Sequence, residues 1–389
     1  MSVIEWGLWG LAAAVVSFVA AELVARAWLA RFGRAYVWAP YGRVRMYLDR
    51  EVLPTLEPIV EHHTNAEGER GDWLPDDTSS MFRILVVGGS AAECWFLDQA
   101  SSWPNIVQKT LREPQNRQRL GVDHVHVGNI GRSLVTTRHL DAILARVLPH
   151  YAKVDAIVFM VGVSDLILWL EQGAPKTLTE EPIPSSALFT QHPDGPFGWR
   201  PGTLALRRIA SAWNRRLRRP ITVRERVGKR LGEVRLMRQN AREMVHEMPD
   251  PTAMLAGFER WFEILLERAK QKSPHVLVVH QPWLEREFTP EEEKLLWSFG
   301  AGRPYAGVVT RYYDHDVAWK LHRLVDRSVT EVAQRAGVEQ LDVMPLVPAD
   351  FEHYYDDHHH TPKGCDIIGR AVAEKLLASA RAHTRAPEH

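Results

Sequence analysis

The sequence predicts an α/β protein with a parallel sheet covered by helices on both faces. Two continuous apolar runs rich in β-branched residues, at 84–87 and 156–161, are each closed by glycine, and a shorter strand is predicted at 124–127. Runs of this kind are typical of strands buried on both faces of a sheet. Because segments with helical spacing alternate with these strands, we expect right-handed crossovers and three layers.

The remaining elements follow the same alternation along the chain. Helices are predicted over 103–111, 137–148, 253–270, 317–336 and 363–378, and further strands over 275–279 and 338–343. Two irregular stretches, 171–250 and 288–311, interrupt the alternation and are interpreted as insertions. A chain of 389 residues can bury the core of one large domain with such additions.

The N-terminus is predicted to be one transmembrane helix. Residues 6–21 are apolar or small apart from Ser17, and 3–29 can cover a span of about 20 residues if Glu5 and Arg26 reach the headgroups. The absence of a basic n-region and of a small-residue cleavage site favours an uncleaved anchor over a signal peptide. The alternative is a buried helix of a soluble protein. Glu22, at the end of the apolar run, needs a partner or an interfacial position.

The predicted organisation has four parts. They are an anchor over 1–30, an extended connector over 31–80, a catalytic domain over 81–380 that contains the insertion 171–250, and a tail over 381–389. Several arginines follow the span and no basic residue precedes it: Arg26, Arg31, Arg34, Arg43 and Arg45. By the positive-inside rule, this distribution favours a cytoplasmic domain.

Composition limits the classes of partner. The chain has 48 basic and 48 acidic residues, so net charge predicts no general attraction to nucleic acid. Its two cysteines, Cys94 and Cys365, are too few for a disulfide framework and lack zinc-site spacing, although a single bridge between them stays open.

The insertion 171–250 becomes strongly basic between 207 and 230, with few acidic residues. Three interpretations stay open: a solvated helical face, a lid over an anionic substrate, or a patch that contacts anionic lipid. RNA binding is disfavoured because aromatic residues are sparse among the arginines, so no nucleic-acid partner is expected.

Four polar segments lie where predicted strands end, at 89–90, 129–134, 162–165 and 354–364. Carboxyl ends of parallel strands meet at one edge of a sheet, so these segments are expected to meet there. A serine nucleophile needs a base, and that base needs an orienting acceptor. Ser90 can be the nucleophile, and the last segment places Asp356 three residues before His359.

The same residues also fit other patterns. Ser90 with Glu93 also fits a helix capping box. The consecutive histidines at 358–360 beside aspartates could bind a metal, but neighbours in a turn rarely point at one centre, so no metal is predicted. Gly88 and Gly89 before Ser90 match neither dinucleotide nor phosphate-loop patterns, so no cofactor is predicted.

The four segments resemble the conserved blocks of the SGNH, or GDSL-like, hydrolase family, in order over 81–377. The matching residues are 87–90, 129–133, 162–165 and 356–359 followed by 361–364. The resemblance implies a flavodoxin-like three-layer α/β/α sandwich, with Ser90 as nucleophile, His359 as base and Asp356 as its acceptor. It also implies an N-terminal membrane anchor of the bacterial type, with the domain outside the cytoplasm.

The resemblance further implies an oxyanion hole made by the N–H groups of Ser90 and Leu134 and by the hydroxyl of Ser164. Three positions depart from the family pattern. Leu134 replaces a glycine, Ser164 replaces an asparagine, and Gly89 replaces an aspartate. Because loss of one oxyanion donor typically costs about 10²–10³ in rate, a slow enzyme or a modified hole is expected.

The predicted function is ester hydrolysis through an acyl-serine intermediate. The substrate would be an acyl or acetyl ester of a lipid or an O-acylated glycan. Two alternatives stay open: an O-acyltransferase that uses the same triad, and a catalytically silent membrane-bound scaffold whose basic insertion binds an anionic partner.

Overall fold

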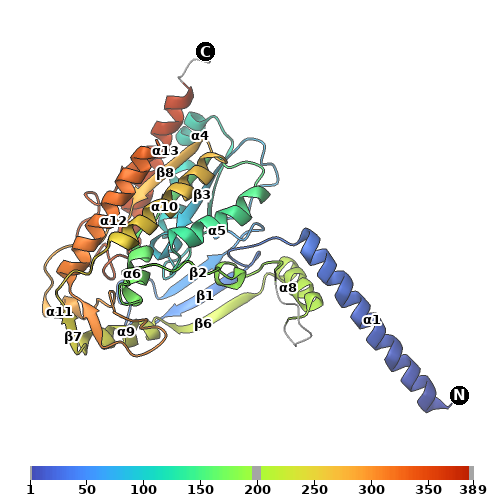
Figure 1. Cartoon of the computed structure of the whole chain (residues 1–389). Helices are drawn as coiled ribbons and strands as arrows, with labels where there is room; N and C mark the ends of the chain where they lie inside the picture. Colours follow the sequence, from blue (N-terminus) through green and yellow to red (C-terminus); the bar gives the residue numbers. More distant parts are fainter. Residues whose placement is uncertain (1, 195–202, 385–389) are drawn as a thin grey trace.

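A computed structural model describes residues 2–194 and 203–384, and its centre is a five-stranded parallel sheet (Figure 1). The strands are β3 (Met81–Gly88), β4 (His124–Asn129), β5 (Ala156–Met160), β8 (His275–His280) and β10 (Glu339–Asp342). Their order across the sheet is β10-β8-β5-β3-β4, with every neighbouring pair parallel. Numbered along the chain this is 5-4-3-1-2, the flavodoxin-like order, whose switch point lies at β3. The predicted fold class is confirmed.

Helices cover both faces of this sheet, as expected. One layer contains α3 (Trp103–Leu111), α4 (Pro114–Leu120) and α13 (Pro362–Thr384), and the other contains α5 (Thr137–Val147), α6 (Val163–Glu171), α10 (Thr252–Lys270) and α12 (His315–Arg335). Alternate side chains of β3 serve the two layers. Ile84 and Val86 pack in the core with α3 and α13, and Leu85 and Val87 pack in the core with α5, α10 and α12. The two-residue period of a strand explains why β3 must be apolar at every position.

The N-terminal helix α1 (Val3–Phe32) extends away from the domain (Figure 1) and is long and apolar enough to cross a membrane. Most of its large apolar side chains are exposed, while Ala25 and Leu29 pack against Ala205 of α8 (Ala205–Arg218).

The predicted need of Glu22 for a partner is met by α8. The Glu22 carboxylate accepts the N–H groups of Ala205, at 2.8 Å, and Leu206, at 3.0 Å, and it also bonds Arg26. A carboxylate at a helix N-terminus satisfies otherwise unpaired N–H groups and the helix dipole. Glu22 therefore fastens α8 to α1.

Residues 31–80 are not an extended connector, so that prediction is wrong. They form β1 (Arg43–Leu48) and β2 (Ile59–His63), which pair with β6 (Ile221–Val227) in a second sheet of order β2-β1-β6. Met46 and Val60 are fully buried in the core that lies under α3 and α13. The local pattern could not show this, because the parallel partner of β1 lies far along the chain inside the basic insertion.

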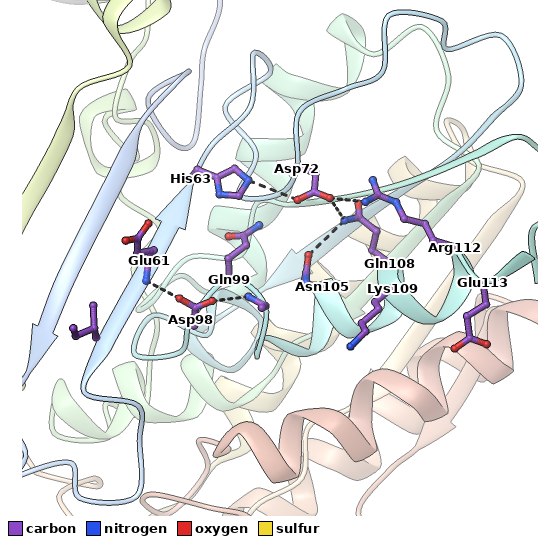
Figure 2. A pocket seen from close by; sticks show the side chains of 12 residues that line it. Glu61, His63, Asp72, Asp98, Gln99, Asn105, Gln108, Lys109, Arg112 and Glu113 are labelled. Atoms are coloured by element: carbon purple, nitrogen blue, oxygen red, sulfur yellow. Dashed lines mark hydrogen bonds and ion pairs between the residues drawn. The ribbon is translucent and has the colours of Figure 1, made fainter.

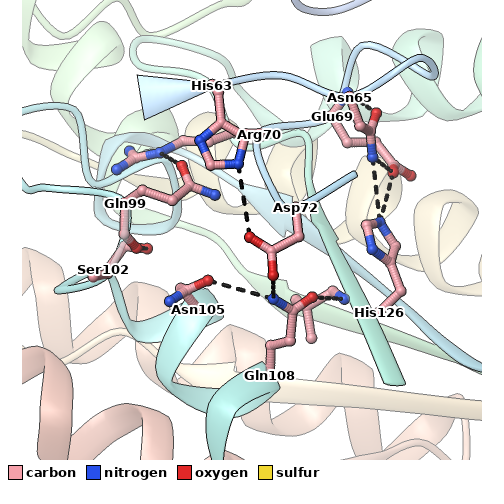
Figure 3. A network of polar contacts seen from close by, with 12 residues as sticks. His63, Asn65, Glu69, Arg70, Asp72, Gln99, Ser102, Asn105, Gln108 and His126 are labelled. Atoms are coloured by element: carbon pink, nitrogen blue, oxygen red, sulfur yellow. Dashed lines mark hydrogen bonds and ion pairs between the residues drawn. The ribbon is translucent and has the colours of Figure 1, made fainter. Parts of the chain in front are cut away.

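A buried polar network holds this segment against the main sheet (Figure 3). The Glu69 carboxylate is fully buried and bonds Asn65, Arg83 and His126, at 2.7, 2.9 and 3.1 Å. Burial opposes ionisation of Glu69, but the bond from His126 and the charge of Arg83 lower its pKa to about 2. An ionised, fully partnered carboxylate at this place makes residues 31–80 part of the domain.

The remaining elements belong mostly to the two insertions. They are α7 (Ser185–Leu188), α9 (Lys229–Gln239), β7 (Glu243–Val245), α11 (Pro290–Glu293) and β9 (Arg311–Tyr313), with the 3₁₀ helix η1 (Leu148–His150) after α5. Parallel pairing of β7 with β9 joins the two insertions to each other. The helix α13 continues to Thr384 and so enters the predicted tail, of which 385–389 lie outside the described residues.

Candidate active site

Ser90 stands at the carboxyl end of β3, the switch point of the sheet. It is the first residue of α2 (Ser90–Glu93), and Gly89 occupies the N-cap position, so Ser90 is not the helix cap. A Cβ atom on Gly88 would lie 2.2 Å from the Met160 carbonyl oxygen of the neighbouring strand. Only glycine permits this close approach, which turns the chain sharply and leaves Ser90 at the open edge of the sheet.

The structure brings Ser90, His359 and Asp356 together. His359 Nε2 lies 2.7 Å from Ser90 Oγ, and His359 Nδ1 lies 2.8 Å from Asp356 Oδ2. The other oxygen of Asp356 accepts the backbone N–H groups of His358, at 3.1 Å, and His359, at 2.9 Å. This is the arrangement of nucleophile, base and orienting acceptor that serine hydrolysis requires.

Two aromatic residues that the sequence did not single out hold the His359 ring. The ring is nearly parallel to Tyr355 and Trp297, at centroid distances of 5.4 and 6.4 Å. Trp297 Nε1–H also donates to Asp356 Oδ2, at 2.9 Å. Trp297 lies in an insertion without regular spacing, so no local signal could have identified it.

Burial and hydrogen bonding distinguish His359 from His358 and His360. Burial lowers the pKa of His358 to about 4 and that of His360 to about 3, so both are neutral at pH 7. Burial opposes ionisation of Asp356, but the neighbouring His359 holds the pKa of that carboxyl well below its usual range. Among the three consecutive histidines, only His359 bonds both a carboxylate and the Ser90 hydroxyl.

The alternative of a metal site can be tested on the same atoms. One ligand atom from each of Asp356, His358 and His359 lies within 4.8 Å of the others. However, both ring nitrogens of His359 are already used, one by Asp356 and one by Ser90. A metal bound by His359 would have to break one of these bonds, so the geometry favours a triad.

On the other side of Ser90, Leu134 has a left-handed backbone, with φ of 58°. This conformation favours glycine, the residue that the family resemblance has at this place. The side chain of Leu134 is 46% exposed and lines the cavity in front of Ser90. Leu134 therefore keeps the backbone geometry expected of glycine. The conformation is strained for leucine, and the side chain takes up space in the cavity.

Ser164 is the second residue of α6 and lies beside the turn that carries Ser90. A Cβ atom on Gly89 would lie 2.5 Å from Ser164 Oγ, so a side chain at 89 would require this hydroxyl to rotate away. The two departures at Gly89 and Ser164 are thus sterically linked. Within the described residues, no hydrogen bond joins the Ser164 hydroxyl to another group, and the hydroxyl is available to a ligand.

The loop that carries Leu134 is tied to α2. Asn129 accepts the N–H of Gly131, at 2.8 Å, and donates to the carbonyl of Ala92, at 2.7 Å. The buried carboxylate of Glu93 accepts both the N–H and the hydroxyl of Ser133. These bonds fix the second segment relative to Ser90.

Arg70, which the sequence also did not single out, clamps the chain after α2. It is buried, and its guanidinium donates to the carbonyls of Glu93, Cys94 and Leu97, at 2.5, 2.8 and 2.8 Å. The nearby thiols, Cys94 and Cys365, are buried and free, so the two cysteines form no bridge. Residues 31–80 thus also position the active-site turn.

The cavity in front of Ser90 has a volume of about 250 Å³ and is mainly apolar. Besides the triad, its lining includes Trp95, Phe96, Ser133, Leu134, Ser164, Ile167, Leu231, Trp297, Tyr305, Tyr355 and His358. Leu231 belongs to the basic insertion and Tyr305 to the second insertion, so both insertions help close the site.

A larger cavity, of about 840 Å³, lies between β2 and α3 (Figure 2). It contains none of the predicted site residues. Its main charged groups already bond each other, since Asp72 bonds Arg112 at 2.5 Å and lies 3.6 Å from His63. No catalytic arrangement is evident among its lining residues.

No protein-family model and no curated protein matches the chain. Among solved structures, it is similar to an acetylxylan esterase from Geobacillus stearothermophilus, with 12% identity, a TM-score of 0.40, and coverage of 78% of this chain and 96% of that chain. A candidate GDSL-like lipase from Parabacteroides merdae gives 12% identity, a TM-score of 0.42 and coverage of 77% and 96%. At these scores the likeness carries no argument about activity. The strand order alone gives the chain the fold that the SGNH resemblance implies.

Proposed function

We propose that the chain is a serine ester hydrolase that forms an acyl intermediate on Ser90. The observation that carries this proposal is the continuous hydrogen-bonded line from Ser90 Oγ through both ring nitrogens of His359 to Asp356. A catalytically silent scaffold would not require this series of hydrogen bonds, nor the aromatic rings that hold His359.

The reaction begins when Ser90 Oγ attacks the ester carbonyl carbon while His359 Nε2 takes the hydroxyl proton. Asp356 stabilises the imidazolium and holds its tautomer. The tetrahedral intermediate then expels the alcohol, which takes the proton from His359, and the acyl group remains on Ser90. Water attacks this acyl group with His359 again as the base, and release of the acid restores Ser90.

The developing oxyanion would be stabilised by three donors. The N–H of Ser90 lies at the start of α2, the N–H of Leu134 comes from the loop tied to that helix, and Ser164 contributes a hydroxyl. A backbone N–H does not depend on the side chain, so Leu134 can replace glycine as a donor.

We further propose that the acyl group is apolar and uncharged. The side chains that line the cavity beyond the triad are mostly aromatic or aliphatic, and none is a lysine or arginine. Such a lining gains free energy by burying apolar surface and offers no partner to a charged acid chain. An acetyl group would leave most of this surface without contact.

Full-length protein in a nonionic detergent tests both proposals with a series of p-nitrophenyl esters from acetate to dodecanoate. We expect hydrolysis that Ser90→Ala abolishes, with kcat/KM rising beyond acetate before it falls again. Activity retained by Ser90→Ala would overturn the hydrolase proposal. Preference for acetate would overturn only the proposed acyl group.

We also propose that α1 anchors the protein in a membrane with the domain outside the cytoplasm. The exposed apolar surface of α1 supports the anchor. The side of the membrane is taken from the SGNH resemblance, although the arginines after the span favour the cytoplasmic side. Protease added to intact spheroplasts should digest the domain. Protection of the domain would reverse the proposed side, and recovery of the full-length chain without detergent would overturn the anchor.

A further inference from the structure

A third cavity, of about 360 Å³, lies where α1 ends and α8 packs beside it. Four arginines line it: Arg34, Arg208, Arg215 and Arg216. No aspartate or glutamate is among the described residues that line it. All of these arginines except Arg34 belong to the basic run between 207 and 230, for which the sequence allowed three interpretations.

The charges of these arginines are poorly compensated. Arg34 bonds Glu67 at 3.4 Å, but Arg215 bonds only the neutral Gln191, at 2.8 Å, and its Nε is buried without a partner in the described chain. Burial lowers the pKa of Arg208 and the positive charge of Arg215 lowers it further, while Asp194, which is bonded to Arg146, acts in the opposite direction. Two partly buried guanidinium groups that repel each other are stabilised by an anion between them.

Aromatic side chains complete the cavity. Trp28 and Phe32 of α1 and Trp213 of α8 line it and remain exposed at 49%, 64% and 61%. Trp28 follows the end of the apolar run by seven residues, or roughly 10 Å along a helix. Aromatic and basic side chains at this depth match the headgroup layer that borders the hydrocarbon of a bilayer.

We propose that this cavity binds the phosphate of an anionic phospholipid headgroup. The guanidinium groups of Arg208, Arg215 and Arg216 donate to the phosphate oxygens, and the aromatic rings contact the glycerol and the first carbons of the acyl chains. Glu22 keeps the two halves of the site together because it fastens the start of α8 to α1. The proposal depends on the membrane anchor and not on the esterase activity.

The test uses full-length protein in a nonionic detergent, titrated separately with phosphatidylglycerol, phosphatidylcholine and inorganic phosphate, with thermal unfolding as the readout. Phosphatidylglycerol should raise the Tm by several degrees and saturate, as a ligand of the folded state does. The other two additions should change the Tm by less than a third of that shift.

The paired change Arg208→Gln with Arg215→Gln should abolish the shift. The matched control is Arg207→Gln with Arg218→Gln, which removes the same charge from exposed positions of α8 outside the cavity and should keep the shift. Arg216 is exposed, so Arg216→Gln should fold normally and weaken the apparent affinity about tenfold.

Three results would overturn the proposal. Equal losses in the cavity pair and the control pair would show that net charge alone attracts the lipid. An equal shift with inorganic phosphate would assign the site to a free anion. The absence of any shift with phosphatidylglycerol in the wild type would show that the cavity takes no such headgroup.

Discussion

The two sides of Ser90 differ in how their polar groups are arranged. On one side, Ser90, His359, Asp356 and Trp297 form an unbroken series of hydrogen bonds. On the other side, Leu134 adopts a backbone conformation suited to glycine, and nearby Ser164 has a hydroxyl with no partner in the described residues.

This difference shows that the departures from the family pattern fall on one side of the nucleophile only. The groups proposed to form and break the acyl bond are complete, whereas the groups proposed to stabilise the oxyanion are altered. Substitutions in the triad should therefore decide whether an acyl-enzyme forms. Substitutions at Leu134 and Ser164 should change how fast it forms.

The largest effect should come from His359→Ala, which removes the base. We expect kcat to fall by about 10⁴–10⁶-fold, as losses of such bases do in other serine hydrolases. His358→Gln is the matched control, since no hydrogen bond in the described residues joins the His358 ring to Ser90 or to a carboxylate, and kcat should fall less than tenfold. A severe loss in His358→Gln with a mild one in His359→Ala would move the base to the neighbouring histidine.

The next effect should come from Asp356→Asn. The amide cannot hold the imidazole in the required tautomer or stabilise its charge, so kcat should fall about 10³–10⁴-fold. Trp297→Phe keeps an aromatic ring beside His359 and removes one hydrogen bond to Asp356, so kcat should fall only about tenfold. If Asp356→Asn kept kcat within tenfold of the wild type, Asp356 would not be the orienting acceptor.

A smaller effect is expected on the oxyanion side. Ser164→Asn supplies an amide donor with a longer reach, so kcat should rise by up to about 10²–10³-fold with little change in KM. Ser164→Ala should lower kcat if the hydroxyl already donates. Steady-state kinetics that stay flat for both variants would place Ser164 outside the hole.

Leu134→Gly should change stability slightly and the acyl preference more clearly. Relief of the left-handed strain should outweigh the flexibility of glycine, so we expect the variant to be more stable by roughly 1 kcal/mol at most. Loss of the side chain should also enlarge the cavity and favour longer p-nitrophenyl esters. A drop in Tm of several degrees would mean that Leu134 packs as a structural residue.

The last prediction concerns stability alone, with no expected effect on kcat, and involves Asp165, next to Ser164. Burial raises the pKa of Asp165 to about 7, despite bonds from Thr137 that oppose this rise. The unfolded chain ionises this carboxyl near pH 4, so its contribution to stability is lost as pH rises from about 4 to about 7. The free energy of unfolding should fall by up to about 1.4 kcal/mol for each pH unit there, and Asp165→Asn should reduce that slope. Urea unfolding of the wild type and of Asp165→Asn at several pH values measures this slope.

The sequence predicted what is local to one strand or turn. The apolar run of β3, the glycines before Ser90 and the Asp356–His359 spacing each have a signature within a few residues, so the main sheet and the residues of the triad could be named. Pairing of β1 with β6, the clamp made by Arg70 and the support from Trp297 join segments far apart in the chain. Their residues have no periodic pattern, so only the folded chain shows them.

The central claim is that Ser90 is a nucleophile activated by His359. Incubation of the full-length protein with a fluorophosphonate, followed by peptide mapping, tests it most directly. The account predicts one phosphonylated residue, Ser90, in the wild type, no labelling in Ser90→Ala and labelling slowed at least 10³-fold in His359→Ala. Hydrolysis of an ester by a wild-type protein that remains unlabelled at Ser90, or equal labelling in His359→Ala, would contradict it.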